Sequence, residues 1–411
     1  MTEPDDASAL PDSVRVRRVR LRHYRNIRAC DIELGPLTFL VGPNGAGKSN
    51  FLDALRLVQE ALTTSLSQAL RERGGIGEVR SRPPDGSVGV SLRLDLPLAT
   101  HRASYAFELG ALADGGFEIV REECLIRPTF DVHAEGTWFS RERETVRSSE
   151  PVLPLVSAER LYLVTSASLP AFHPVFDTLS RMAFYNPSPE QMRRLQTPDP
   201  GAPLARDARN VASVLHRMKT GSRPKETIEE FLRVIVPGLS GVDHAALGPM
   251  EALEFRQQVE GESALWRFPA QSMSDGTLRA LAVLVAIFQT DPKGLPPSLV
   301  GLEEPESAVY PFAAAVLRDA LAEASLTRQI VVTSHSHDLL DDPDVSPDTL
   351  VAVESQNGVS LLARPNQVSL SALRDRLYTA GELLRINHLS PDSQAPGLDP
   401  ERLAIFEHTS S

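Results

Sequence analysis

Alternating apolar and polar residues near the start of the chain predict β-strands that lead into a loop. Between residues 14 and 40, apolar side chains alternate with charged ones, and Gly35-Pro36 interrupts the pattern before the apolar stretch Thr38 to Val41. A period of two residues is typical of strands that bury one face. The apolar residues that follow recur at helical spacing, and they are Phe51, Leu55, Val58 and Leu62. The pattern therefore predicts strands, a loop and an amphipathic helix, in that order.

Strand-like and helical patterns occupy different parts of the remaining chain. Strand-like pieces at 88–96, 103–109 and 117–126 predict a β-rich stretch. Helical periods dominate between about 150 and 272. The apolar runs after this segment alternate between helix and strand, and they are 278–288, 299–302, 312–324 and 330–333. Such alternation is typical of a parallel α/β sheet.

The length of the chain predicts two lobes. Its 411 residues exceed the roughly 250–300 residues at which one hydrophobic core stops growing. We expect a first lobe built from residues 13–149 and 290–390, with a helical lobe, residues 150–289, inserted between its two parts. Residues 1–12 are expected to form a disordered tail, and residues 391–411 a C-terminal tail.

Composition excludes several classes of protein. Hydrophobic residues make up 42% and charged residues 23%, which excludes wholesale disorder and collagen-like repeats. The longest apolar stretch, Ala280 to Phe288, is far shorter than the ~20 residues of a membrane span, and the acidic N-terminus is not a signal peptide. We therefore expect a cytoplasmic protein with no membrane contact. Cys30 and Cys124 lack metal-ligand spacing and are expected to be reduced core residues.

The net charge of −12 argues against a protein whose whole surface coats nucleic acid. A local basic patch stays open, because seven arginines stand near the N-terminus, at positions 15, 17, 18, 20, 22, 25 and 28. These arginines form either a stripe that follows DNA phosphates or a set of charges that keeps an edge strand soluble. The sequence favours neither interpretation.

Residues 42–49 carry the strongest chemical signal. They match G-x-x-x-x-G-K-[ST], the P-loop, and lie between a predicted strand and a predicted helix. In such a loop, glycines let backbone N–H groups turn toward phosphates, Lys48 reaches the β- and γ-phosphates, and Ser49 ligates Mg²⁺. The residues expected to bind the nucleotide are Gly42, Pro43, Asn44, Gly45, Ala46, Gly47, Lys48, Ser49 and Asn50.

An apolar strand that ends in carboxylates, residues 299–306, supplies the expected second half of the phosphate site. We expect Glu303 to join the Mg²⁺ shell through a water and Glu304 to polarise the attacking water, because adjacent side chains at a strand end point in different directions. The next strand ends in Thr333-Ser334-His335, which places His335 where it can sense the γ-phosphate. A hydrolase-type metal site in this segment and a purely structural histidine are the alternatives.

A second anion site is predicted before the apolar helix that starts near residue 278. A serine, a glycine and several free N–H groups gather there at a helix N-terminus. The order and spacing are those of the ABC signature loop, which contacts the γ-phosphate bound by another subunit, and an ordinary helix cap is the alternative. The residues expected to contact nucleotide are Ser274, Asp275, Gly276 and Thr277.

Taken in order, these motifs resemble those of the RecF/SMC-like ABC ATPases, and more closely those of standalone bacterial ATPases with S-D-G-T-L-R and E-E-P-E. Such proteins are related to OLD-type ATPase domains, but we expect no nuclease domain here. The resemblance extends over about residues 14–390, with further matches at Tyr24 to Ile27, Lys48 to Leu52 and Arg209 to Leu215. It implies an α/β fold: a P-loop ABC-type ATPase head with a mixed or parallel sheet lobe and an inserted helical lobe.

The resemblance also implies an ATPase that uses ATP and Mg²⁺, with Lys48, Glu304 and His335 as catalytic residues. ATP would lie between two copies of the chain, each giving its signature loop to the P-loop of the other. We expect an ATP-driven dimerising switch that gates a partner effector, such as a separate nuclease, or DNA, in bacterial defence. A RecF-like DNA-repair or DNA-loading ATPase and an ATP-binding regulator with little turnover are the alternatives. The Q-loop position stays open, with Glu122 and Glu123 as candidates.

Overall fold

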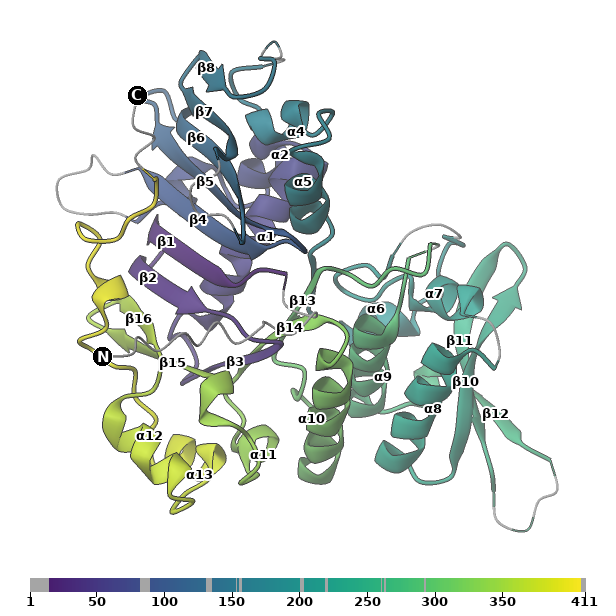
Figure 1. The fold of residues 1–411 in the computed structure, drawn as a ribbon. Helices are drawn as coiled ribbons and strands as arrows, with labels where there is room; N and C mark the ends of the chain where they lie inside the picture. The colour runs from purple at the N-terminus through teal and green to yellow at the C-terminus, as the bar shows by residue number, and fades with distance from the viewer. Residues whose placement is uncertain are drawn as a thin grey trace.

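The computed structural model describes residues 15–81, 89–130, 135–152, 154, 157–199, 203–218, 221–259, 261, 264–291 and 293–407. The tail expected at 1–12 lies outside these residues. A large twisted sheet with helices packed on it forms one lobe, and a smaller lobe of helices and strands lies beside one end of that sheet (Figure 1). None of the described helices is both long and apolar enough to cross a membrane.

The large sheet contains thirteen described strands in the order β8-β7-β6-β5-β4-β1-β2-β16-β15-β3-β14-β13-β9. Their bounds are β1 Arg18–Tyr24, β2 Ile27–Glu33, β3 Leu37–Val41, β4 Val90–Pro97, β5 His101–Ala111, β6 Phe117–Pro128, β7 Thr137–Glu142, β8 Thr145–Ser148, β9 Ala183–Tyr185, β13 Leu299–Glu303, β14 Gln329–Ser334, β15 Leu350–Gln356 and β16 Val359–Ala363. Strands β4 to β8 are antiparallel, as expected for the β-rich stretch. The sheet is therefore mixed, which confirms the predicted fold class.

Three neighbouring parallel strands of the large sheet, β3, β14 and β13, determine where the functional residues meet. Strand β14 pairs in parallel with β3 on one side and with β13 on the other. All six residues of β14 are buried, which explains its continuous apolar character. Because the strands are parallel, their carboxyl ends lie at one edge of the sheet.

Helix α1 (Lys48–Thr63) packs on one face of the sheet through the residues that the helical spacing indicated, including Phe51 and Leu55. Four shorter helices also belong to the first lobe, and they are α2 Leu66–Arg71, α3 Ile76–Val79, α4 Tyr162–Ser166 and α5 His173–Ser180. Buried side chains of α1, α4 and α5 belong to the same hydrophobic core as those of β4 to β6.

The segment 150–289 differs from the expected helical lobe in two respects. Buried residues between 161 and 184 pack into the core of the first lobe, and β9 joins the large sheet. The rest contains a three-stranded antiparallel sheet besides its helices. Its elements are α6 Pro189–Arg193, α7 Val211–Arg217, α8 Arg223–Ile235, β10 Leu239–Leu247, β11 Met250–Gln257, β12 Trp266–Pro269 and α9 Asp275–Phe288. Helix α10 (Pro311–Ser325) packs against α8 and α9.

The C-terminal residues do not form a free tail. After α11 His337–Leu340, α12 Gln367–Arg374 and α13 Ala380–Arg385, the chain returns to the large sheet, where a 3₁₀ helix at Pro396–Leu398 begins a segment that we call the C-terminal strap, residues 396–407 (yellow in Figure 1). Leu403 and Ile405 are buried there against Ala29 and Ala106 of the sheet. The expectation of a tail was wrong for these residues, because apolar side chains near the end of the chain are buried on the sheet.

Candidate functional site

The loop between β3 and α1 has a backbone that requires glycine. Gly45 and Gly47 have φ angles of 78° and 104°, in the left-handed region. A Cβ atom on Gly42 would lie 1.9 Å from the carbonyl oxygen of Val353, and one on Gly47 would lie 2.0 Å from Oγ of Ser360. The loop is therefore packed closely against the hairpin of β15 and β16, and it leads directly into the N-terminus of α1.

Lys48 lies over this loop and is only 4% exposed. Its Nζ donates hydrogen bonds to the carbonyl oxygens of Gly42, at 2.8 Å, and Pro43, at 2.9 Å. Burial lowers the pKa of the Lys48 ammonium, and the negative charges of Glu304 and Glu306 act against that shift. The lysine thus lies within electrostatic reach of carboxylates that follow β13.

The two residues after Lys48 differ in their surroundings. Ser49 is exposed in the first turn of α1. The side-chain amide of Asn50 donates a 2.6 Å hydrogen bond to Oδ1 of Asn26, in the turn between β1 and β2. Asn50 is therefore held by the neighbouring turn, whereas Ser49 is exposed.

The predicted pair Glu304 and His335 is brought together by strand pairing. Glu303 at the end of β13 stands opposite Thr333 of β14, so the residues that follow the two strands are neighbours. Nδ1 of His335 lies 3.2 Å from Oε1 of Glu304. Glu304 has a φ angle of 43°, an uncommon conformation for this residue type that surrounding contacts must hold. Its backbone N–H donates to the carbonyl oxygen of Thr333 at 3.0 Å.

Arg279 of α9 holds the backbone after β13, a contact that the sequence analysis missed. Its guanidinium donates to the carbonyl oxygens of Glu303 and Glu304, each at 3.1 Å. It also donates to Oδ1 of Asn186 and to the carbonyl oxygen of Pro187. Arg279 is the last residue of the S-D-G-T-L-R motif, so the motif signalled its presence but not its partner.

Glu306 is a second residue whose place the sequence did not reveal. Its side chain is 6% exposed, and its Oε1 accepts a 2.6 Å hydrogen bond from Oγ of Ser334. Its Oε2 is buried and has no hydrogen-bond partner among the described residues. Burial raises the pKa of Glu306. This oxygen is an acceptor that a water or a bound ligand would satisfy.

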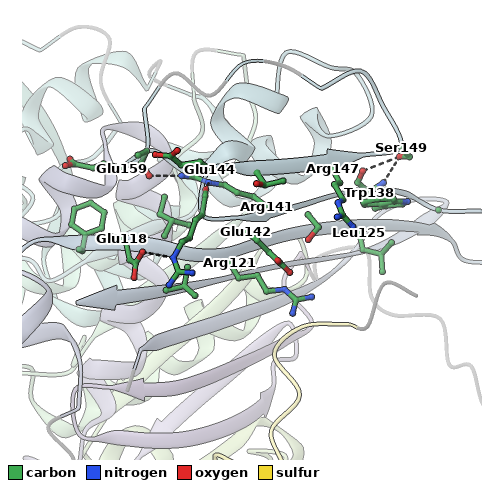
Figure 2. Close-up of a pocket in the computed structure, with 18 of the residues that line it drawn as sticks. Glu118, Arg121, Leu125, Trp138, Arg141, Glu142, Glu144, Arg147, Ser149 and Glu159 are labelled. Carbon is green, nitrogen blue, oxygen red and sulfur yellow. Dashed lines mark hydrogen bonds and ion pairs between the residues drawn. The ribbon is translucent and has the colours of Figure 1, made fainter. Parts of the chain in front are cut away.

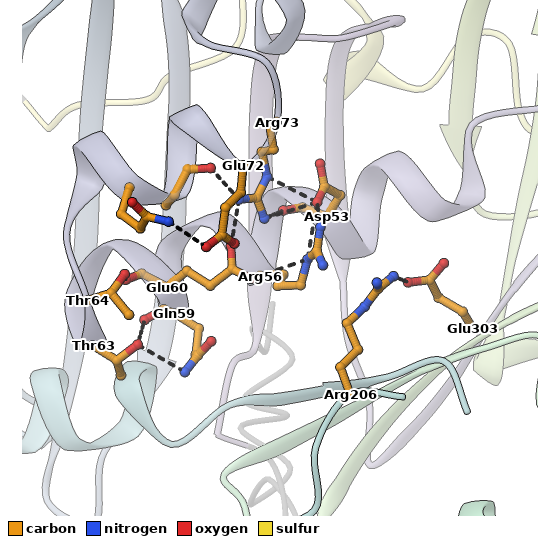
Figure 3. Close-up of polar contacts among 12 residues, drawn as sticks. Asp53, Arg56, Gln59, Glu60, Thr63, Thr64, Glu72, Arg73, Arg206 and Glu303 are labelled. Carbon is orange, nitrogen blue, oxygen red and sulfur yellow. Dashed lines mark hydrogen bonds and ion pairs between the residues drawn. The ribbon is translucent and has the colours of Figure 1, made fainter. Parts of the chain in front are cut away.

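Glu303 is directed to the α1 side of the sheet. A Cβ on Gly301, two residues earlier, would lie 3.4 Å from Leu52 of α1, and alternate residues of a strand share a face. The carboxylate of Glu303 forms an ion pair with Arg206, whose Nη2 lies 2.5 Å from Oε1 (Figure 3). Arg206 belongs to the second lobe, and no motif in the sequence pointed to it.

The predicted signature loop begins α9. Oγ of Ser274 accepts a 3.1 Å hydrogen bond from the backbone N–H of Thr277 and so caps the helix. Oδ1 of Asp275 lies 2.5 Å from Nη2 of Arg193. A Cβ on Gly276 would lie 2.5 Å from the carbonyl oxygen of Ala308, so only glycine fits there. Ser274 and Asp275 are exposed, whereas Thr277 is buried.

The arginines of β1 are paired with acidic side chains. Arg18 and Arg20 both contact Asp31, at 2.5 and 3.2 Å, and Arg22 contacts Glu108 at 3.2 Å. Strand β1 lies between β2 and β4, so the interpretation as an edge strand was wrong. The other interpretation, a phosphate-following stripe, loses four of its seven charges: three to partners within the sheet, and Arg25 to Asp53 of α1 at 2.8 Å.

Neither Q-loop candidate contacts the P-loop through a described hydrogen bond or ion pair. Glu122 accepts hydrogen bonds from the backbone N–H groups of Tyr162 and Leu163, at 2.6 and 2.9 Å, inside the first-lobe core. Glu123 contacts Arg121 and the backbone N–H of Glu407. Among the described residues no group of three or more His, Cys, Asp or Glu side chains is placed to hold a metal ion, so the ligands required by the alternative metal site are not gathered.

A broad hollow over β6 to β8 lies apart from these residues (Figure 2). Its described lining includes five arginines and five glutamates, and Arg143 forms an ion pair with Glu118 at 3.0 Å. The hollow therefore has no excess of positive charge that would select a phosphate ligand.

Comparison with known proteins shows what parts of the chain are similar to. The family model described as "AAA domain, putative AbiEii toxin, Type IV TA system" matches residues 37–130 and 243–342. The DNA replication and repair protein RecF of Vibrio vulnificus (strain YJ016) is 50% identical over 42 residues, 10% of this chain and 12% of RecF. The OLD nuclease of Thermus scotoductus is 46% identical over 43 residues, 10% of this chain and 8% of that protein. These matches thus span only a small part of either relative.

Solved structures support the same assignment at the level of the fold. The Smc head domain with an extended coiled coil, bound to the C-terminal domain of ScpA and derived from Pyrococcus furiosus, has a TM-score of 0.50 at 12% identity. The likeness covers 88% of this chain and 99% of that one. Together with the partial family match and the motifs, this architecture supports the predicted resemblance: the chain has the fold of an SMC head, and its motifs are similar to those of RecF/SMC-like ATPases.

Proposed function

We propose that the chain binds ATP with Mg²⁺ at the P-loop, hydrolyses it slowly, and acts as an ATP-driven dimerising switch. The observation that carries this proposal is the meeting of Lys48, Glu304 and His335 at the carboxyl ends of three neighbouring strands, with His335 3.2 Å from Glu304. A lysine, a carboxylate and an imidazole at one sheet edge, beside a glycine loop, form a set that can bind phosphates and activate water.

The residues present fit ATP and Mg²⁺. Left-handed glycines and the N-terminus of the 16-residue helix α1 supply N–H groups and a partial positive charge for phosphates. The Ser49 hydroxyl and the Glu303 carboxylate are hard oxygen donors of the kind that Mg²⁺ prefers. When bound, Mg²⁺ would neutralise charge on the β- and γ-phosphates.

The chain's own residues then divide the chemistry between them. Lys48 pairs with the β- and γ-phosphates. Glu304 orients a water molecule and accepts its proton, and its strained backbone, held by Arg279, fixes where the carboxylate points. His335, whose Nδ1 lies 3.2 Å from the Glu304 carboxylate, would contact the γ-phosphate.

Each ATP is shared by two copies of the chain. Ser274 and Asp275 are exposed at the start of α9, where the helix N-terminus can receive the γ-phosphate bound by the other copy. Closure of the pair is the switch, and its output is the gating of a partner effector, such as a nuclease, or of DNA in bacterial defence. The description of the matching family names a "putative AbiEii toxin" of a Type IV toxin–antitoxin system, and because such a system has two components, it supports a protein partner for the chain.

A RecF-like role in DNA repair is the second candidate, and the identity with RecF over 42 residues favours it. Binding of DNA that depends on salt and is stimulated by ATP would favour this role, whereas recovery of an effector in a defined complex with the chain would favour the first.

ATP binding and hydrolysis by Lys48→Ala test the proposal. Hydrogen bonds to charged groups contribute roughly 1.5–3 kcal/mol, so this variant should lose about tenfold or more in affinity for a fluorescent ATP analogue and should lose Mg²⁺-dependent turnover. Lys293→Ala, at an exposed lysine outside the site, is the matched control and should behave as the wild type. Equal affinity and turnover in Lys48→Ala and wild type would refute the assignment.

A further inference from the structure

The carboxylate that the proposed function gives to the Mg²⁺ shell already has a cationic partner. Nη2 of Arg206 lies 2.5 Å from Oε1 of Glu303, with side-chain exposures of 44% and 20% (Figure 3). The two residues are 97 positions apart in the chain. The ion pair joins the second lobe to the end of β13.

The backbone around Arg206 is held firmly, so only its long side chain is free to move. The carbonyl oxygen of Arg206 accepts a 2.8 Å hydrogen bond from the N–H of Asn186, and that of Asp207 accepts one at 3.0 Å from Ser188. Leu204 and Ala208, on either side, are buried in the hydrophobic core that the second lobe shares with β3, β13 and β14 of the sheet. A change in the partner of the Arg206 guanidinium is therefore a change at the boundary between the lobes.

Arg279 and Arg206 act on different parts of the same segment. Arg279 binds the carbonyl oxygens of Glu303 and Glu304, so its contacts do not occupy a carboxylate. Arg206 binds the Glu303 carboxylate itself. A guanidinium and a divalent cation compete for the same oxygens, because each is attracted to the negative charge and repelled by the other.

We propose that Arg206 is a positioning residue that acts as a latch on Glu303, and that Mg²⁺-ATP must displace it to recruit this carboxylate. The inference rests on the proposed function and adds a regulation of the same site. Release of Arg206 removes one tie between the second lobe, which carries the signature loop, and the sheet.

The test measures nucleotide binding rather than turnover. The affinity of the full chain for a fluorescent ATP analogue is titrated with Mg²⁺ for wild type and Arg206→Gln. The half-saturating Mg²⁺ concentration should fall about two- to fivefold in Arg206→Gln, the range that a partly exposed ion pair supports. Arg206→Lys, which keeps the charge, should restore the wild-type requirement. Arg209→Gln, at an arginine that pairs with Asp207 rather than with Glu303, should leave it unchanged.

The possible outcomes distinguish a failure of the Arg206 latch from a failure of the proposed ATP site. Binding that depends on Lys48 but has the same Mg²⁺ requirement in wild type and Arg206→Gln overturns the latch and leaves the ATP site standing. A higher requirement in Arg206→Gln also overturns it, because Arg206 would then assist binding. Binding that does not depend on Lys48 overturns the proposed function and the latch together. Thermal melts of the four proteins show whether a shift comes from misfolding, and an equal shift in Arg206→Lys would count against the latch.

Discussion

Nδ1 of His335 lies 3.2 Å from Oε1 of Glu304, although the two residues follow different strands. Their contact depends on β14 lying between β3 and β13, with Glu303 opposite Thr333 and Ser334 opposite Val41. The same pairing places both side chains next to the loop that carries Lys48. One feature of sheet topology therefore assembles residues from three separate motifs.

Glu304→Gln should bind ATP with nearly wild-type affinity and lose about 10²–10⁴-fold in turnover, because the carboxylate that accepts a proton from water is neutralised while Lys48 and Ser49 remain. Steady-state phosphate release and analogue binding measure the two effects. Glu323→Gln, at an exposed glutamate of α10, is the control. Unchanged turnover in Glu304→Gln would remove this residue from the catalytic role.

Mixing two inactive variants should restore ATPase activity if each ATP is shared by two copies. Lys48→Ala lacks phosphate binding but keeps its signature loop, whereas Ser274→Arg keeps its P-loop and places bulk where the partner's γ-phosphate must fit. In a mixed pair, one of the two interfaces combines intact parts. Phosphate release after equimolar mixing, with subunit exchange demonstrated, is the measurement.

Ser274→Asn controls for loss of the helix cap in this experiment. Ser274 caps α9, and asparagine is an equally good cap, so this variant separates capping from obstruction of the site. It should remain folded to the same temperature as the wild type. If exchange occurs and mixing restores nothing, either both sites act together or the assignment of the signature loop is wrong. Light scattering of Glu304→Gln at saturating ATP distinguishes these two explanations. If this variant is a monomer, the assignment of the signature loop is wrong.

Asp53→Asn should destabilise the first lobe. Asp53 is 9% exposed and contacts Arg25 at 2.8 Å. It also contacts Arg56 at 2.6 Å and Arg73 at 3.0 Å (Figure 3). Loss of its charge takes one carboxylate from these guanidinium groups, and the buried Arg73 keeps only Glu60 as an ion-pair partner. We expect a cost of roughly 1–3 kcal/mol. Urea unfolding followed by circular dichroism measures the change.

The matched control for Asp53→Asn is Glu72→Gln, at an exposed carboxylate that accepts a hydrogen bond from Gln68. It should change the free energy of unfolding by less than about 0.5 kcal/mol. Equal midpoints for Asp53→Asn and Glu72→Gln would show that the buried network around α1 adds nothing to stability.

Glu407→Gln should lower stability near neutral pH by about 1 kcal/mol, and the difference from wild type should vanish in acid. Burial of Glu407 favours its neutral form, but the hydrogen bonds and charges of Arg93 and Arg127 outweigh burial and lower the pKa of Glu407. A carboxylate with a lowered pKa stabilises the fold above its unfolded pKa, about 4.3, and this contribution is lost as the pH falls through the folded value.

Melting temperatures from pH 7.5 down to pH 3 compare these proteins. The gap between wild type and Glu407→Gln should stay constant to about pH 5 and close below about 4.3. Glu401→Gln, an exposed change on the same strap, should give no gap at any pH. A gap that persists to the lowest pH would mean that Glu407 does not hold the strap through its charge.

Two parts of the fold show which elements the local sequence pattern could predict and which it could not. The strand Thr38 to Val41, the glycine loop and α1 were predicted because a strand or helix with one buried face has a period that neighbouring residues alone reveal. The small sheet of β10 to β12 was not predicted, although Gly248-Pro249 forms the two-residue turn between Leu247 and Met250. Its short apolar runs are compatible with either helix or strand, so only pairing decides.

The sequence by itself determined the chemistry that is local: the P-loop, the carboxylates after an apolar strand, the histidine after the next strand and the serine that caps α9. Only the tertiary structure decided which of these side chains meet and what else reaches them. It set Arg206 on Glu303 across 97 residues, left Oε2 of Glu306 buried beside Ser334, and brought Glu407 to Arg93 across 314 residues. Such contacts depend on how separate elements pack, and no period or spacing along the chain encodes the distance between their side chains.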